Sequence, residues 1–165
     1  MIDPCASEPD VFLYGARRLL LVLHTAGAVV LLGSATHHAL LMRHYLRGRF
    51  ERIALEKTYA RVLCVAYAVT FAIGALVYPT YRVHVRGYHL DRFAPEYARL
   101  FDVKETWASL ALFVALGLGA LSFAWRPREE PWLAPIVAVM SFVVCAVVWF
   151  DAVIGILVTS VRGIG

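Results

Sequence analysis

The apolar segment from Leu19 to Met42 constrains the fold of this chain more than any other feature. A helix needs about 20 apolar residues to cross the hydrocarbon core of a bilayer, so this segment is long enough to span it. Polar and small residues recur along it at steps of three and four: His24, Gly27, Leu31, Ser34 and His38. That spacing places them on one helical stripe. Lipid rejects polar groups, so the stripe must face protein, a cofactor or water.

The rest of the chain repeats this alternation of apolar segments and charged connections. Hydrophobic residues make up 61% of the sequence and charged residues only 17%, whereas a soluble domain has roughly 25% charged residues. The sequence therefore predicts an all-α polytopic membrane protein, with four transmembrane helices in an up-down bundle that forms a single domain over residues 1–165. The expected spans are residues 19–42, 62–79, 103–125 and 132–160, with an extramembrane connection over 80–102.

Local signals set the expected helix ends. Residues 50–61 hold no Pro or Gly, so a solvated helical extension is expected to run directly into the second span. Pro79 should close that span, because proline cannot continue a regular helix. Asp102 and Glu105 have the spacing of a capping box and should start the third span. A short interfacial helix over residues 94–101 should precede it.

The basic residues predict orientation rather than nucleic-acid binding. They crowd the first and third connections: Arg43, Arg47, Arg49, Arg52, Lys57, Arg61, Arg126 and Arg128. Basic residues flanking spans favour the cytoplasmic side and contact anionic lipid, so both termini are expected on the non-cytoplasmic side. Only two of the 16 basic residues are lysines. This arginine bias favours a bacterial inner membrane.

Asp151 is the only acid deep within a span, and His24 is its best-placed partner. With four spans, both lie in the same half of the membrane, roughly 13–14 Å and 8 Å from the same surface at the helical rise. A buried acid costs about 2.5–3.5 kcal/mol and needs a partner or a wet cavity. The pair is expected to handle protons or a ligand, to orient a metal-bound or haem-bound imidazole, or to form a structural hydrogen bond between helices.

The spacing of His24 and His38 corresponds to about 21 Å of helical rise on one face. In this respect residues 19–42 resemble a ligand helix of membrane b-type cytochromes, in which two haems stack across the membrane. The resemblance covers one helix of four, and it implies haem b as cofactor. The other spans lack histidine, so a second ligand would come from His84, His89, Met140, another copy of the chain or a partner subunit.

Three histidines approach the basic end of the first span: His37, His38 and His44. Imidazoles at headgroup depth are expected to be solvated there. His37 and His44 are also weak metal candidates, since no carboxylate or thiol accompanies them at ligand spacing. His84 and His89 lie among arginines, which favours a surface location.

The sequence contains no nucleotide-binding loop, paired nucleophile and base, or zinc-protease motif. We therefore expect a chain without a catalytic centre of its own. It would act as an integral subunit of a larger membrane assembly, such as a respiratory or electron-transfer complex, or as a homo-oligomer. The alternatives are a cofactor-free scaffold or assembly subunit and, less favoured, a small transporter, because one buried acid and no broken-helix repeat make a poor route.

Overall fold

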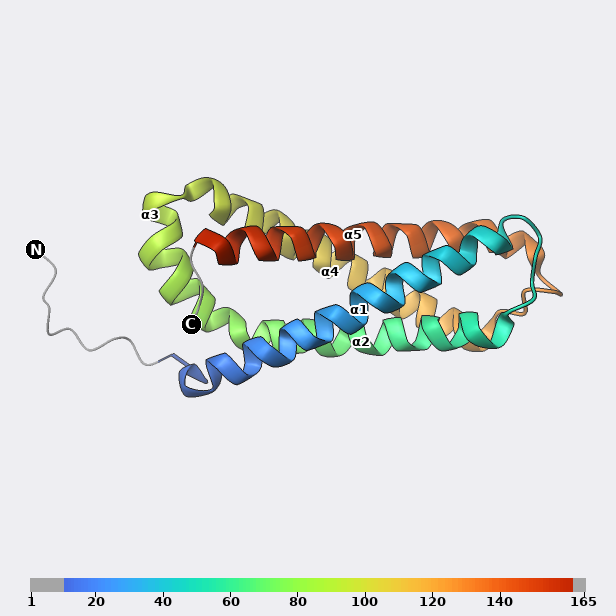
Figure 1. The fold of residues 1–165 in the computed structure, drawn as a ribbon, viewed down its shortest axis with the longest axis horizontal. Coiled ribbons are helices and arrows are strands. Elements are labelled where there is room, and N and C mark those ends of the chain that lie inside the picture. The colour runs from blue at the N-terminus through green and yellow to red at the C-terminus, as the bar shows by residue number, and fades with distance from the viewer. Residues whose placement is uncertain (1–10, 162–165) are drawn as a thin grey trace, which may run out of the picture.

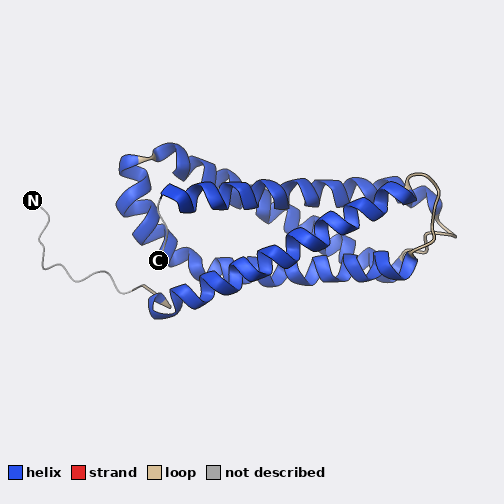
Figure 2. Ribbon diagram, in the orientation of Figure 1, coloured by secondary structure: helices blue, strands red, loops and turns tan. Residues whose placement is uncertain are grey.

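Four long helices dominate the computed structural model, which describes residues 11–161. The chain is 89% helical and has no strand in that range. The ends of the predicted domain, residues 1–10 and 162–165, lie outside the described residues. Figures 1 and 2 show that the four long helices run along the longest axis of the molecule. Their bounds are Arg17–Tyr45 (α1), Ile53–Thr80 (α2), Pro95–Ala124 (α4) and Ala134–Val161 (α5).

The helices form a closed up-down bundle in which each packs against two others. The packed pairs are α1 with α2, α2 with α4, α4 with α5, and α5 with α1. Helix α1 begins and α5 ends at the same end of the bundle, on the left in Figure 1. The opposite end carries the α1–α2 and α4–α5 turns. The predicted all-α bundle of four antiparallel helices is therefore confirmed.

Each long helix is apolar enough to cross a membrane. The candidate spans are Tyr14–Tyr45, Ile53–Phe93, Pro95–Ala124 and Pro131–Val161, with mean hydropathy between 1.9 and 2.5. Large apolar side chains point outward, including Phe113 at 72% exposure and Ile156 at 71%. Small and branched side chains fill the interior instead, as a bundle in lipid requires, because close helix packing must replace the hydrophobic effect.

The prediction that Pro79 closes the second span is wrong. Pro79 lies inside α2, and the backbone continues helically through a π-helical segment, Tyr81–Leu90 (η2), and a short turn, Asp91–Phe93 (α3). Proline removes one backbone hydrogen bond. Local π adjustments satisfy the carbonyls that a proline frees in membrane helices. The π-helical segment begins two residues after Pro79, and the helix continues through it.

The third long helix begins earlier than expected. The break comes at Ala94, whose φ of −152° and ψ of 59° leave the helical region, and Pro95 occupies the first helical turn of α4, where its missing N–H costs nothing. The predicted interfacial helix over 94–101 and the third span are thus one helix. Asp102 does not cap it but lies inside α4, where both carboxylate oxygens accept hydrogen bonds from Arg86.

The expected extension over residues 50–61 runs directly into α2, which begins at Ile53. The α1–α2 turn bends at Gly48, whose φ of 72° is in the region that favours glycine. One part of the expectation is wrong, since Glu56 is only 2% exposed. Its carboxylate turns inward between the helices, where the buried His38 is its hydrogen-bond partner.

Gly119 of α4 allows α4 to approach α2 closely. A Cβ built there would lie 2.5 Å from Cys64 Sγ and 2.8 Å from Cys64 Cβ on α2, so one helix must shift. We expect Gly119→Ala to lower the free energy of unfolding by about 2 kcal/mol, as overpacking typically does. Unfolding in detergent micelles measures this. The matched control is Gly33→Ala, where nothing lies within 4 Å; equal stability of the two variants would contradict the prediction.

Candidate functional site

The polar stripe of α1 contributes residues to two separate clusters of polar side chains, which lie at opposite ends of the bundle. The first, called the His24 cluster, comprises His24, Thr70, Lys104, Asp151 and Tyr67. The second, called the His38 cluster, comprises His38, Glu56 and Ser141. The stripe residue between them, Ser34, is 4% exposed and donates its hydroxyl to the Leu31 carbonyl 3.1 Å away. The two clusters are therefore distinct sites.

His24 lies against α2. Its Nδ1 is 3.0 Å from the Thr70 carbonyl oxygen, which can only accept, so the bond requires a proton on Nδ1. In the neutral imidazole, Nε2 then has a free lone pair. A Cβ at Gly74 would lie 3.0 Å from His24 Cε1. Glycine at this position thus makes the space that the imidazole ring occupies.

Asp151 of α5 is partly buried, and its Oδ1 is enclosed without a hydrogen-bond partner. The Lys104 ammonium of α4 interacts electrostatically with both Asp151 and His24. Among residues 11–161 no hydrogen bond or ion pair within 4.0 Å joins His24 to Asp151. The expected direct contact does not form; the imidazole instead donates its Nδ1–H to the Thr70 carbonyl oxygen.

Tyr67 completes the His24 cluster from α2. Its hydroxyl donates to the Ala108 carbonyl of α4 at 2.9 Å, and Asp151 acts on it electrostatically. All four long helices thus contribute polar groups to this region. Lys104 was not predicted to belong to this site, because it lies between Asp102 and Glu105 of the predicted capping box and is typical of a charge that flanks a span.

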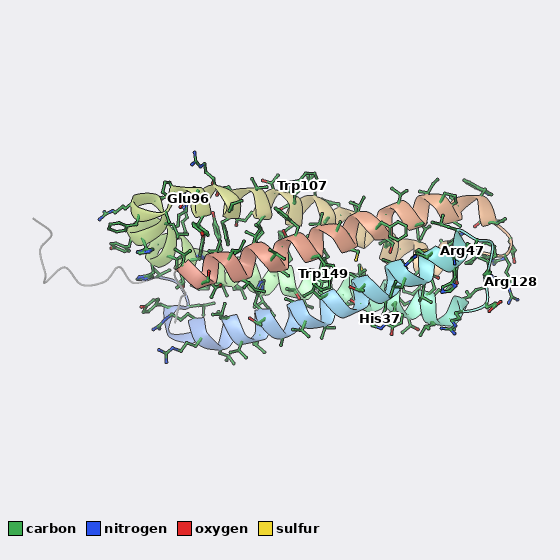
Figure 3. The ribbon with its side chains drawn as sticks, turned by 45° about the horizontal axis from the view of Figure 1, so that its top comes forward. His37, Arg47, Glu96, Trp107, Arg128 and Trp149 are labelled. Atoms are coloured by element: carbon green, nitrogen blue, oxygen red, sulfur yellow. The ribbon has the colours of Figure 1, made fainter. Side chains whose placement is uncertain are left out.

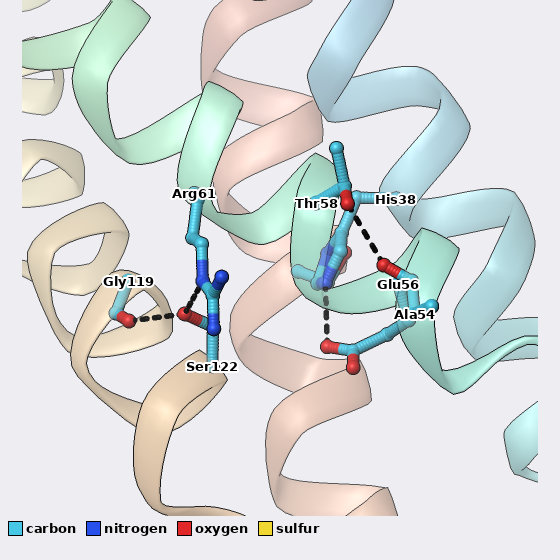
Figure 4. A network of polar contacts seen from close by, with 8 residues as sticks. His38, Ala54, Glu56, Thr58, Arg61, Gly119 and Ser122 are labelled. Carbon is cyan, nitrogen blue, oxygen red and sulfur yellow. Dashed lines mark hydrogen bonds and ion pairs between the residues drawn. The ribbon is translucent and has the colours of Figure 1, made fainter.

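The His38 cluster is the better enclosed of the two. His38 is 0% exposed; its Nδ1 lies 2.8 Å from Ser141 Oγ of α5 and its Nε2 lies 3.3 Å from Glu56 Oε1 of α2. Figure 4 shows the Glu56 carboxylate directed at the imidazole. The expectation of a solvated His38 is therefore wrong. Because α2 starts early, the Glu56 carboxylate lies beside His38. This hydrogen-bond partner lowers the free-energy cost of burying the imidazole.

The expected role of His38 as a haem ligand does not fit this arrangement. A neutral imidazole coordinates iron through a ring nitrogen that carries no other bond, and both ring nitrogens of His38 are engaged. Met140 lies against α4, where a Cβ at Gly117 would be 3.0 Å from its Cε. Of the two haem ligands predicted on α1, His24 keeps one ring nitrogen, Nε2, without an assigned partner.

The remaining histidines lie apart from both clusters. His84 and His89 are half-buried on η2, where their rings pack on Tyr14 at 4.6 Å and on Phe93 at 5.3 Å between centroids. His37 is exposed and stacks on Tyr59, as its outward position in Figure 3 shows, and His44 is exposed as expected. No group of three His, Cys, Asp or Glu side chains suited to a metal occurs in residues 11–161.

An apolar layer separates the two clusters. Its members come from all four helices and are at most 6% exposed: Leu31, Leu63, Ala115 and Val144. Close-packed aliphatic side chains leave no room for a chain of waters, and they carry no group that passes a proton. The bundle interior is therefore polar near both ends and mainly apolar in the middle, where Ser34 is a buried polar residue.

Glu56 should stabilise the bundle more than its neighbour Glu51. We expect Glu56→Ala to lower the free energy of unfolding by about 3 kcal/mol, because it leaves the buried His38 without one partner. Ser141→Ala should cost about 1 kcal/mol, the loss of one hydrogen bond between membrane helices. Unfolding in micelles compares these variants with Glu51→Ala, an exposed control. Equal effects at residues 56 and 51 would argue against a buried pair.

Lys104 and Asp151 should be energetically coupled although they do not form a close ion pair. A double-mutant cycle with Lys104→Met and Asp151→Asn should give a coupling free energy of about 1 kcal/mol, since each charge acts on the other inside the bundle. A cycle of Lys104→Met with the exposed Glu129→Gln at the other end should be additive. Additivity in both cycles would place Lys104 outside the His24 cluster.

Comparisons with known proteins find no matching family model, no matching curated protein and no matching solved structure. The functional conclusion therefore depends on the chemistry of the two buried clusters and on the membrane character of the four helices.

Proposed function

We propose that this chain is an integral membrane subunit that takes up and releases protons at the His24 cluster, in the service of a larger membrane assembly. The observation that carries the proposal is the enclosed Oδ1 of Asp151, which has no hydrogen-bond partner. An intramembrane carboxylate without a bonded partner is a functional group by default, because it costs free energy that a purely structural residue would not.

The surroundings of Asp151 suit reversible proton binding. The Lys104 ammonium of α4 acts electrostatically on the carboxyl group, which is partly buried in the bundle. His24 adds a second group able to bind a proton, and its Nε2 is free of an assigned partner. The cluster thus combines a donor and an acceptor in one half of the bundle.

The apolar layer between the clusters argues for exchange with one side of the membrane. Leu63, Ala115 and Val144 are each 0% exposed, and a proton has no relay through them. This disfavours the small-transporter alternative. It supports a subunit that holds a proton, or presents one to a neighbouring subunit, without carrying it across.

A haem-binding electron-transfer role receives less support. The resemblance to b-type cytochromes used both His24 and His38, and the second has no free ring nitrogen. His24 would need a second axial ligand from a partner subunit. The orientation stays a proposal based on the basic turns, with both termini on the non-cytoplasmic side of a bacterial inner membrane.

Infrared difference spectroscopy of the protein in liposomes tests the proposal. A pH change outside the liposomes should produce a carboxyl band in the wild type that is absent in Asp151→Asn and shifts in His24→Gln. Glu129→Gln removes an exposed carboxyl and serves as control, with the band retained. A wild-type spectrum identical to that of Asp151→Asn would refute proton exchange at this residue.

A flux measurement in the same liposomes separates local exchange from transport. With a membrane potential imposed, the wild type and Asp151→Asn should leak protons at the same rate, because the apolar layer blocks passage. A flux that depends on Asp151 would instead favour the transporter.

A further inference from the structure

A small pocket at the α1–α2 turn has no role in either buried cluster. It has a volume of about 110 Å³ and is lined by Leu41, His44, Tyr45, Arg49, Glu51 and Arg52. That volume is several times what one water needs. Three of the six lining side chains carry nitrogen donors that suit an anion. The pocket lies at the end of the bundle where Arg47 and Arg128 also project (Figure 3).

The start of α2 lies next to this pocket, because the N-cap residue Arg52 lines it. Arg52, the N-cap residue, forms no side-chain cap, and the helix begins at Ile53. The first N–H groups of a helix have no acceptor within it, and the helix dipole places partial positive charge there. The acid of this first turn, Glu56, is directed to His38 instead. This N-terminus is therefore left without an anionic partner of its own.

Tyr45 is the observation that points to a ligand. The side chain is 2% exposed, its ring packs edge-on against Phe50 at 5.2 Å, and its hydroxyl has no hydrogen-bond partner. A buried hydroxyl without a partner costs about 1–3 kcal/mol. Tyr45 lines the pocket, so a ligand held there is the proposed partner of this hydroxyl.

We propose that this pocket binds a phosphate group. Two guanidiniums from Arg49 and Arg52 pair with its oxygens in the forked geometry that suits phosphate. The free N–H groups of α2 and the Tyr45 hydroxyl supply neutral donors. Glu51, the one acid in the lining, is exposed and turns to water when the anion enters. The site lies at the opposite end from the His24 cluster, so it stands independently of the proposed proton exchange.

A phosphate group at this depth has two sources with the same chemistry. One is the headgroup of an anionic phospholipid, which basic residues beside a span commonly contact. The other is free inorganic phosphate. The pocket forms from groups at the ends of two helices, so either source meets the same donors.

Two measurements on the purified full-length protein test the proposal and separate the sources. Native mass spectrometry counts bound phosphatidylglycerol against phosphatidylcholine, and calorimetry titrates inorganic phosphate. The test variants are Arg49→Gln/Arg52→Gln and Tyr45→Phe, which removes only the hydroxyl. Arg126→Gln is the matched control, an exposed arginine at the same end that pairs with Glu129 and does not line the pocket. Far-ultraviolet circular dichroism checks that each variant keeps its helices.

We expect one phosphate-bearing ligand per chain in the wild type. Its affinity should fall at least tenfold in the double arginine variant and about threefold in Tyr45→Phe, and should be unchanged in Arg126→Gln. Preference for phosphatidylglycerol without phosphate binding identifies the lipid, and phosphate binding identifies the free ion; either outcome supports the pocket. Equal retention of both lipids with no phosphate binding overturns the proposal. A loss in Arg126→Gln equal to that in the double variant also overturns it, since general charge would then explain binding.

Discussion

Hydrogen bonds between polar side chains of different helices help to determine how the four helices of this bundle meet. His38 illustrates it most fully, because one imidazole ties α1 to Glu56 of α2 and to Ser141 of α5. Helix packing in lipid gains little from burying apolar surface. Directional bonds of this kind therefore set which helix faces lie inward. Trp125, 2% exposed, and Tyr45 close the same end of the bundle with their aromatic rings.

The opposite end is organised differently. The π-helical segment η2 and the start of α4 fold over it, with Tyr81 stacked on Phe101 at 3.9 Å and Arg86 bound to Asp102. Below them, His24 of the His24 cluster is bonded to the Thr70 carbonyl, while Asp151 Oδ1 has no hydrogen-bond partner. Both ends retain unpaired polar atoms, which include Glu56 Oε2 and the Tyr45 hydroxyl at the other end. Proton exchange is proposed at His24 and Asp151 because His24 keeps a ring nitrogen without an assigned partner, whereas both ring nitrogens of His38 are engaged.

The sequence was sufficient to predict four helices and their antiparallel order, because apolar length and charge segregation are properties of single segments. It also predicted that His24 and Asp151 lie in the same half of the bundle, whereas His38 was expected to be solvated and is buried. It did not predict Glu56 or Lys104, since each lies in a stretch rich in charges, and only the three-dimensional path shows that its side chain turns inward. The continuation of the helix past Pro79 was not predicted either, because no local sequence pattern indicates the π-helical segment that follows it. The predicted direct pairing of His24 with Asp151 was wrong for a similar reason. The acceptor that His24 uses is the backbone carbonyl of Thr70, and because every residue has such a carbonyl, the sequence does not single it out.

The apolar layer of Leu31, Leu63, Ala115 and Val144 has an electrical consequence. The transmembrane voltage falls mainly across the low-dielectric part of the protein, and moving one charge through all of it is worth about 2.3 kcal/mol per 100 mV. His24 lies roughly 8 Å below its surface by helical rise, about a quarter of a 30 Å core. A proton arriving at His24 from that surface crosses about a quarter of the field, so resting potentials bias its occupancy by only a few tenths of a kcal/mol. The proton occupancy of a group at this depth would depend on the pH on its own side of the membrane and only weakly on the membrane voltage.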